Sequence, residues 1–184
     1  LAEFECSHTN AATNVLSRNM LPDTDFSNLL YVDLGQANVN ATIYGVIKSN
    51  NTGGDYQLIG IPYAASSLNS ISLYTRNQSI WATCFNNDVD LRINSMVFHV
   101  LTISINEVYK KAFFYVDGVK QTELSYNNGG RYGTFGGFYN GDIFSYMGGT
   151  TILYGAVVSG TDNDETVIAN QQLLLTRYSQ YIGT

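Results

Sequence analysis

Hydrophobic and polar residues alternate along most of this chain in short runs. The clearest run is 96–106, where Leu101, Ile103 and Ile105 alternate with Thr, Ser and Asn residues. Alternation with a period of two predicts a β-strand with one buried face. Similar runs recur at roughly ten-residue spacing, with turn-rich breaks between them. The predicted strands are residues 28–34, 41–48, 56–62, 70–76, 80–85, 89–93, 96–106, 112–116, 119–124 and 150–159.

The pair Asp117 and Gly118 joins two of these strands, 112–116 and 119–124. A two-residue type I′ turn needs positive φ at both positions, and Asp-Gly accepts this readily. The sequence therefore predicts a tight hairpin here, and with 96–106 a three-strand antiparallel meander.

A single helical pattern follows the last strand. Asp162 and Glu165 are spaced as a capping box, and Val167, Ile168, Leu174, Leu175 and Tyr178 form an apolar face, with Gly183 as the stop. Short strands without helices between them favour an all-β fold. We expect one domain over residues 1–184, with an irregular segment at 1–27. It should be a jelly-roll sandwich of two antiparallel sheets with a short C-terminal helix.

Two segments carry a resemblance to a known family. Phe98-His99-Val100-Leu101-Thr102 stands where the concanavalin-A-like lectin/glucanase superfamily has W-H-x-V-x-x-T, with Phe98 in place of the Trp, and Tyr115-Val116-Asp117-Gly118 matches its Y-V-D-G hairpin. The strand ILYGAVVSG and the helix after it resemble the C-terminus of laminin-G-like domains in bacterial and phage surface proteins. The resemblance covers residues from 96 onward and implies a lectin-like sandwich that binds a glycan or receptor.

Composition and charge narrow the set of partners. Charged residues make up 13% of the chain, the net charge is −6, and Lys110-Lys111 is the one basic pair. Nucleic-acid binding requires a clustered basic patch, so we expect no nucleic-acid partner. No run is long enough for a transmembrane helix, so we expect no membrane insertion. An amide- and hydroxyl-rich surface is typical of extracellular, cell-surface or virion-exposed proteins that bind sugars.

The sequence contains no recognisable arrangement of catalytic residues. Retaining glycoside hydrolysis needs two carboxylates about 5 Å apart, and the E-x-D-x-x-E pattern of the glucanase branch is not found. His99 is interpreted as a strand residue satisfied at a sheet edge. We therefore predict that the chain is not an enzyme.

The Gly- and aromatic-rich segment 127–149 is the predicted binding loop. Aromatic faces pack on the C–H side of a sugar ring, while amides, carboxylates and guanidinium groups bind its hydroxyls. Trp81 is a further stacking candidate, although a lone Trp is more often a core residue. The predicted ligand-binding residues are Asn128, Arg131, Tyr132, Phe135, Phe138, Tyr139, Asn140, Asp142 and Trp81.

Calcium is the one cofactor that the sequence suggests. Asp88 and Asp90 offer carboxylates at alternate positions, as do Asp162 and Asp164, although turns and caps use the same residues. The two cysteines, Cys6 and Cys84, are either bridged or reduced, and spacing does not decide between these states.

The function predicted from these features is a non-catalytic carbohydrate- or receptor-binding module of a surface adhesin or of a phage or viral fibre, in which it could be oligomeric. Two alternatives stay open. One is a glycan-degrading glycoside hydrolase with an unusual carboxylate pair, and the other is a structural or protein-binding laminin-G-like module.

Overall fold

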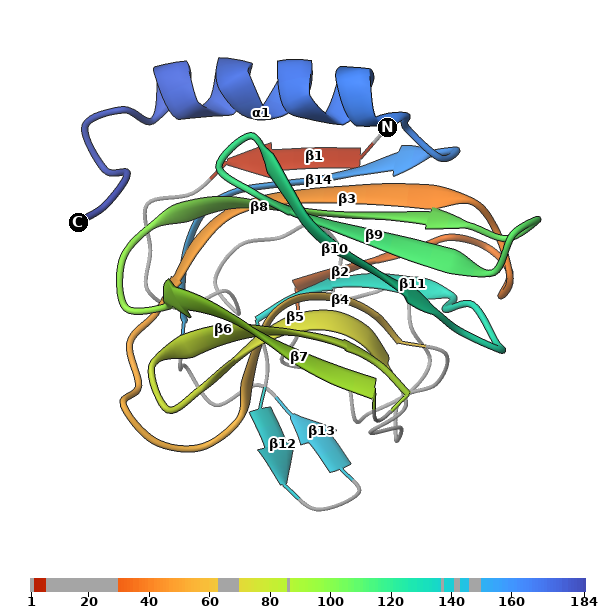
Figure 1. Ribbon diagram of the computed structural model, residues 1–184, viewed down its shortest axis with the longest axis horizontal. Helices are drawn as coiled ribbons and strands as arrows, with labels where there is room; N and C mark the ends of the chain where they lie inside the picture. Colours follow the sequence, from red (N-terminus) through yellow and green to blue (C-terminus); the bar gives the residue numbers. More distant parts are fainter. Residues whose placement is uncertain are drawn as a thin grey trace.

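The chain folds into two stacked antiparallel sheets with one helix across the top (Figure 1). This computed structural model describes residues 2–5, 30–62, 70–85, 87–136, 138–140, 143–145 and 150–184. Within these ranges, no helix is long and apolar enough to cross a membrane. The strands are β1 (Ala2–Glu5), β2 (Leu30–Asp33), β3 (Ala41–Ser49), β4 (Tyr56–Pro62), β5 (Ser70–Arg76), β6 (Ser79–Cys84), β7 (Asn87–Asn94), β8 (His99–Asn106), β9 (Lys111–Val116), β10 (Val119–Ser125), β11 (Tyr132–Phe135), β12 (Phe138–Asn140), β13 (Ile143–Ser145) and β14 (Thr150–Ser159), followed by helix α1 (Asp164–Arg177).

The first sheet has the order β1-β14-β3-β8-β9-β10 among the described strands. Its long-range pair is β3 with β14, which runs from Ala41 opposite Ser159 to Ser49 opposite Thr150. Strands β8, β9 and β10 form the predicted meander. Asp117 and Gly118 have φ of +50° and +82°, so the predicted Asp-Gly turn is confirmed.

The second sheet has β4, β5, β6 and β7 as successive antiparallel neighbours, with β11 on the other side of β4 and β2 beyond it. The short hairpin of β12 and β13 also joins β4, through Phe138 opposite Tyr56. This arrangement of two antiparallel sheets and one C-terminal helix confirms the predicted all-β jelly-roll sandwich.

The core lies between the two sheets and is built from the inward-facing residue of each alternating pair. Ile43 and Phe114 of the first sheet and Leu58, Leu73 and Phe135 of the second have no exposed surface. Full burial of such side chains contributes about 1.5–3 kcal/mol each. The alternation that marked the strands in the sequence is therefore the pattern that builds the core.

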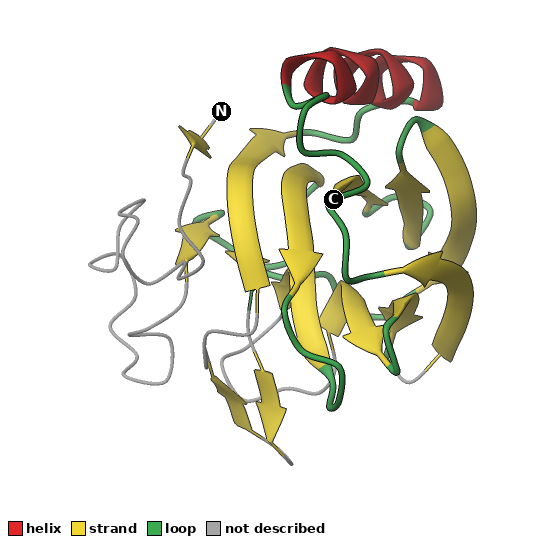
Figure 2. Cartoon of the chain, turned by 90° about the vertical axis from the view of Figure 1, so that its left-hand side faces the viewer, coloured by secondary structure: helices red, strands yellow, loops and turns green. Residues whose placement is uncertain are grey.

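Helix α1 covers the outer face of the first sheet, as the two orthogonal views show (Figures 1 and 2). Its residues Val167, Leu174 and Tyr178 are buried in a second cluster against side chains of β3, β8, β9 and β14. Gln171 lies on the same face and is also fully buried. Its Nε2 donates to Thr102 Oγ1 at 2.8 Å and to Val100 O at 3.2 Å, and its Oε1 accepts from Gly118 N–H at 2.6 Å.

The helix boundaries differ from those predicted. Asn163, not Asp162, is the N-cap, and its side chain accepts a hydrogen bond from Thr166 N–H at 2.8 Å. Asp162 instead accepts from the Tyr44 hydroxyl at 2.6 Å. The helix ends at Arg177, before Gly183. The tail then returns to Phe98, the residue before β8. Phe98 N–H donates to Thr184 O, and Gly183 N–H donates to Phe98 O.

Two segments predicted as irregular contain strands. Ala2–Glu5, within the segment 1–27, forms β1 and pairs with Tyr154–Val157 of β14. The predicted loop 127–149 contains β11, β12 and β13. Strand β11 forms because it finds pairing partners on both sides, β2 and β4, which outweighs the low strand preference of its glycine-rich surroundings.

Candidate functional site

A group of polar and aromatic side chains lies together on the outer face of the second sheet. We call it the Trp81 patch. Its members come from strands β5, β6 and β7 and from the residue before β4: Asp55, Tyr74, Arg76, Ser79, Trp81, Asp88 and Asp90.

Strand parity explains why these side chains share a face. In β5 and β6, Leu73, Ile80 and Ala82 point into the core, so their neighbours along each strand point outward. The register then places Tyr74 opposite Trp81, and Trp81 opposite Asp90. Three strands thus contribute one continuous row of side chains.

Arg76 is the centre of the patch. Its Nε and Nη2 donate to the Asp55 carboxylate at 3.0 and 2.6 Å, and its Nη1 lies 3.4 Å from Asp88 Oδ2. The hydrogen bonds to Asp55 are the main reason that the pKa of Arg76 is raised. Tyr74 hydroxyl also donates to Asp88, at 3.0 Å. The Arg76 side chain is still 38% exposed, so solvent and ligands can reach it.

The aromatic rings lie beneath this guanidinium. Arg76 Cζ is 5.1 Å from the centre of the Tyr74 ring and 5.3 Å from that of Trp81, within the range of a cation–π contact. The two rings are 6.4 Å apart. Trp81 Nε1 is buried and has no hydrogen-bond partner in the described part of the chain. An unsatisfied buried indole N–H carries a free-energy cost.

The predicted calcium residues are both in this patch. Asp88 accepts from Tyr74 and Arg76, while Asp90 Oδ1 accepts from the Ser79 hydroxyl at 2.5 Å and from Arg92 N–H at 2.9 Å. These bonds lower the pKa of Asp90, first through Ser79 and then through Arg92. Among the described residues, no three His, Cys, Asp or Glu side chains form a group that could hold a metal. A cation would have to replace protein hydrogen bonds, so the calcium role stays a prediction.

The residues predicted from the 127–149 segment are not all available to a ligand. Phe135 is fully buried in the core, so its prediction as a ligand contact is wrong, because β11 turns this side chain inward. Tyr132 is half-buried against the same core, with Arg131 Cζ 5.2 Å from its ring centre. Asn128 is exposed. The backbone of Phe138, Tyr139 and Asn140 forms β12, but their side chains lie outside the described part, as does Asp142.

His99 and Cys84 are structural residues in this fold. His99 Nδ1 lies 2.6 Å from Asp117 Oδ2 and its Nε2 lies 2.8 Å from Asn94 O. These bonds agree with the prediction of a satisfied strand residue. The predicted position at a sheet edge is wrong, because β8 lies between β3 and β9 in the first sheet. Cys84 is buried in the core, which raises the pKa of its thiol to about 12 and keeps it unreactive. Cys6 lies outside the described residues, so the bridge between them stays a prediction.

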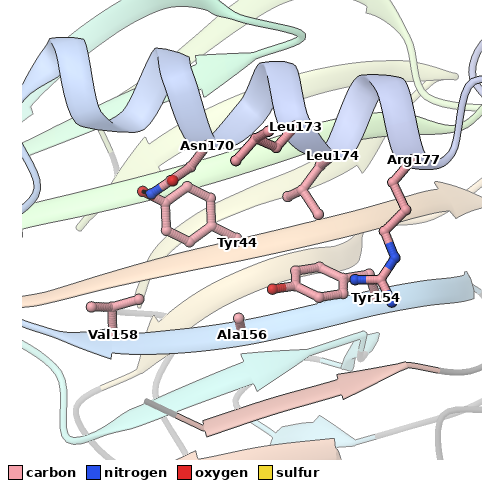
Figure 3. A pocket seen from close by; sticks show the side chains of 8 residues that line it. All are labelled: Tyr44, Tyr154, Ala156, Val158, Asn170, Leu173, Leu174 and Arg177. Atoms are coloured by element: carbon pink, nitrogen blue, oxygen red, sulfur yellow. Dashed lines mark hydrogen bonds between the residues drawn. The ribbon is translucent and has the colours of Figure 1, made fainter.

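A pocket lies under the helix, away from the Trp81 patch (Figure 3). It has a volume of about 310 Å³, with Tyr44 and Tyr154 as aromatic walls and Asn170 and Arg177 at the helix side (Figure 3). Tyr44 hydroxyl is already bonded to Asp162 and Asn170, and Ala156, Val158, Leu173 and Leu174 line the rest. This pocket offers an apolar surface, whereas the Trp81 patch offers several donors and acceptors for a polyol.

Sequence reasoning missed Tyr74, Arg76 and Asp55 as site residues. The sequence does contain a signal that places Tyr74 and Arg76 beside Trp81 and Ser79. Asn77 and Gln78 form a two-residue turn with φ of +52° and +63°, so Tyr74 must lie opposite Trp81. Asp55 carries no comparable signal, because it reaches Arg76 from the preceding loop only after β4 and β5 have paired.

No protein-family model and no curated protein sequence matches the chain. Solved structures match it in fold. The CBM40 of the Ruminococcus gnavus IT-sialidase, bound to α2,3-sialyllactose, matches with a TM-score of 0.56 and 15% identity, over 72% of this chain and 82% of that one. The NanB sialidase from Streptococcus pneumoniae matches with a TM-score of 0.55 and 14% identity. A leech intramolecular trans-sialidase matches with a TM-score of 0.52 and 18% identity.

The chain spans only about a quarter of the length of the two larger sialidases, 26% and 25%, while they cover 76% of it in each case. At these identities the likeness shows the fold alone, a jelly-roll β-sandwich. The more specific laminin-G-like assignment stays a prediction.

Proposed function

We propose that this chain is a non-catalytic carbohydrate-binding module that holds a glycan on the Trp81 patch. The observation that carries the proposal is the convergence of an indole, a guanidinium and three carboxylates on one outer sheet face. A sugar needs this combination: an apolar aromatic surface together with donors and acceptors for its hydroxyls. The structural likeness to a CBM40 that holds sialyllactose supports the class of function.

The chemistry of the carboxylates supports binding over hydrolysis. A glycosidase needs one carboxylic acid with a raised pKa to protonate the leaving group. In the patch, Asp55 and Asp88 share the Arg76 guanidinium, and Asp90 has a lowered pKa. Each of the three carboxylates accepts hydrogen bonds from neighbouring side chains.

A glycan array followed by calorimetry on the hits tests the proposal. Trp81→Ala should weaken binding tenfold or more, which corresponds to about 1.4 kcal/mol. Leu173→Ala, an exposed change at the rim of the pocket under the helix, is the matched control and should bind normally. Normal binding by a folded Trp81→Ala variant would place the site elsewhere. The double variant Tyr139→Ala with Arg131→Ala then tests the 127–149 segment.

The same assay separates the alternatives. Release of reducing sugar from a hit would favour a glycoside hydrolase. An array without hits, together with binding to a protein, would favour the structural or protein-binding module. Adding calcium or EDTA tests Asp88 and Asp90 as ligands, because a calcium-dependent module would lose its glycan in EDTA.

The wider setting proposed is extracellular, on a cell or virion surface, as part of an adhesin or fibre. The low charge and amide-rich composition support it. Mass photometry of the purified chain tests whether it forms an oligomer as fibre modules do.

A further inference from the structure

The Trp81 patch has a charge pattern that bears on which glycans it can hold. Its two nearby cations are Arg76 and Arg92, and its carboxylates are Asp55, Asp88 and Asp90, so two positive charges face three negative ones. The whole chain is also acidic, with a net charge of −6. An anionic ligand placed here would meet a negative, and therefore unfavourable, electrostatic potential.

The guanidinium of Arg76, at the centre of the patch, is already paired with carboxylates of the protein. A carboxylate ligand is held best by two parallel N–H groups of one guanidinium. In Arg76, Nε and Nη2 already make this pair of bonds to Asp55, and Nη1 faces Asp88. A ligand carboxylate would have to displace Asp55 and leave that half-buried carboxylate without its partner, which is costly.

Hydroxyl groups fit the same atoms without such competition. The Asp88 side chain is 30% exposed, and Asp90 is an exposed residue. Each carboxylate has more acceptor positions than its present donors use. A sugar hydroxyl can donate a hydrogen bond to either carboxylate. The patch therefore presents mainly acceptors, which hydroxyls satisfy and carboxylates do not.

We propose that the Trp81 patch selects uncharged glycans and discriminates against sialylated ones. This inference rests on the proposed function and makes it more specific. It separates this chain from the CBM40 of its structural neighbour, which is bound to sialyllactose, a ligand that carries a carboxylate.

The test uses matched pairs of glycans with and without terminal sialic acid, such as α2,3-sialyllactose and lactose, on one array. Neutral members should bind at least tenfold more tightly, and the ratio should increase at low salt, because screening weakens as the Debye length grows. Asp90→Asn should reduce the ratio. Glu165→Gln removes the same charge from the first turn of α1 and is the control that should leave the ratio unchanged. Thermal unfolding of each variant verifies that it is folded.

The outcomes distinguish the two proposals. Neutral binding with weaker sialylated binding supports both. Equal or tighter binding of the sialylated members overturns the selectivity and leaves the carbohydrate-binding function standing. If Asp90→Asn and Glu165→Gln reduce the ratio of neutral to sialylated affinity equally, the selectivity comes from the overall charge of the protein. That result overturns the role of the patch. Binding of neither member overturns the proposed function and the selectivity with it.

Discussion

Gly118 has a φ of +82° in the turn between β9 and β10, a region that side chains with a β-branch resist. Gly118→Val should therefore destabilise the fold by about 1–3 kcal/mol. A Cβ at this position would also approach the Gln172 amide to 2.5 Å. Thermal unfolding measures the change. Gly53→Ala is the control, since a Cβ there meets nothing within 4 Å, and an equal loss in both variants would contradict the role of the turn.

His99 is bonded through both ring nitrogens to oxygen atoms that can only accept, the Asp117 carboxylate and the Asn94 carbonyl. The doubly protonated imidazolium is the form of the ring that can donate to both of these oxygens. Burial lowers the pKa of His99, but the bonds and charge of Asp117, with Asn94, raise it on balance above its ordinary value.

A raised folded pKa means that the contribution of His99 to stability is complete below its unfolded pKa, about 6.5, and is lost as pH rises through the folded value. Urea unfolding between pH 5 and 9 should show this decline. His99→Gln should flatten it, and an unchanged slope in that variant would assign the pH dependence to other groups.

At the scale of elements, Gln171 is the polar link between α1 and the first sheet. Its amide joins the helix to β8 and to the turn at Gly118. Gln171→Ala should cost about 1–3 kcal/mol, because buried partners lose their bonds. Amide hydrogen exchange should then be faster in α1 than in the core strands. Gln172→Ala, its exposed neighbour, is the control and should leave exchange unchanged.

The elements also show what sequence reasoning can reach. Apolar runs between turn-rich breaks predict the bounds of β4, β5 and β14, and Asp-Gly predicts the β9–β10 hairpin. Strand β11 was not predicted, because its place depends on β2 and β4, which are distant in sequence. The helix cap shifted from Asp162 to Asn163 because Tyr44, more than a hundred residues earlier, binds Asp162. Asp55 was missed for the same reason, because it reaches Arg76 only after β4 and β5 have paired.

At the scale of the molecule, Trp81 is the single tryptophan of the chain and lies in the proposed site. Intrinsic tryptophan fluorescence therefore reports on the patch alone. Titrating the protein with a glycan from the array should change the emission intensity or wavelength. The Kd from this titration should equal the Kd from calorimetry. A titration with buffer that contains no glycan is the control. Binding detected by calorimetry without any change in emission would show that the glycan sits away from Trp81.

The pairing of β3 with β14 has a consequence for how the protein is made. Ala41 and Ser159 are neighbours in the sheet but lie 118 positions apart along the chain, so β3 keeps one edge unpaired until β14 has left the ribosome. Contacts of such long sequence separation make folding slow, and an open strand edge invites pairing with other chains. A nascent chain halted at residue 149 should therefore aggregate or recruit chaperones, while release of the remaining residues closes the edge and renders the protein protease-resistant.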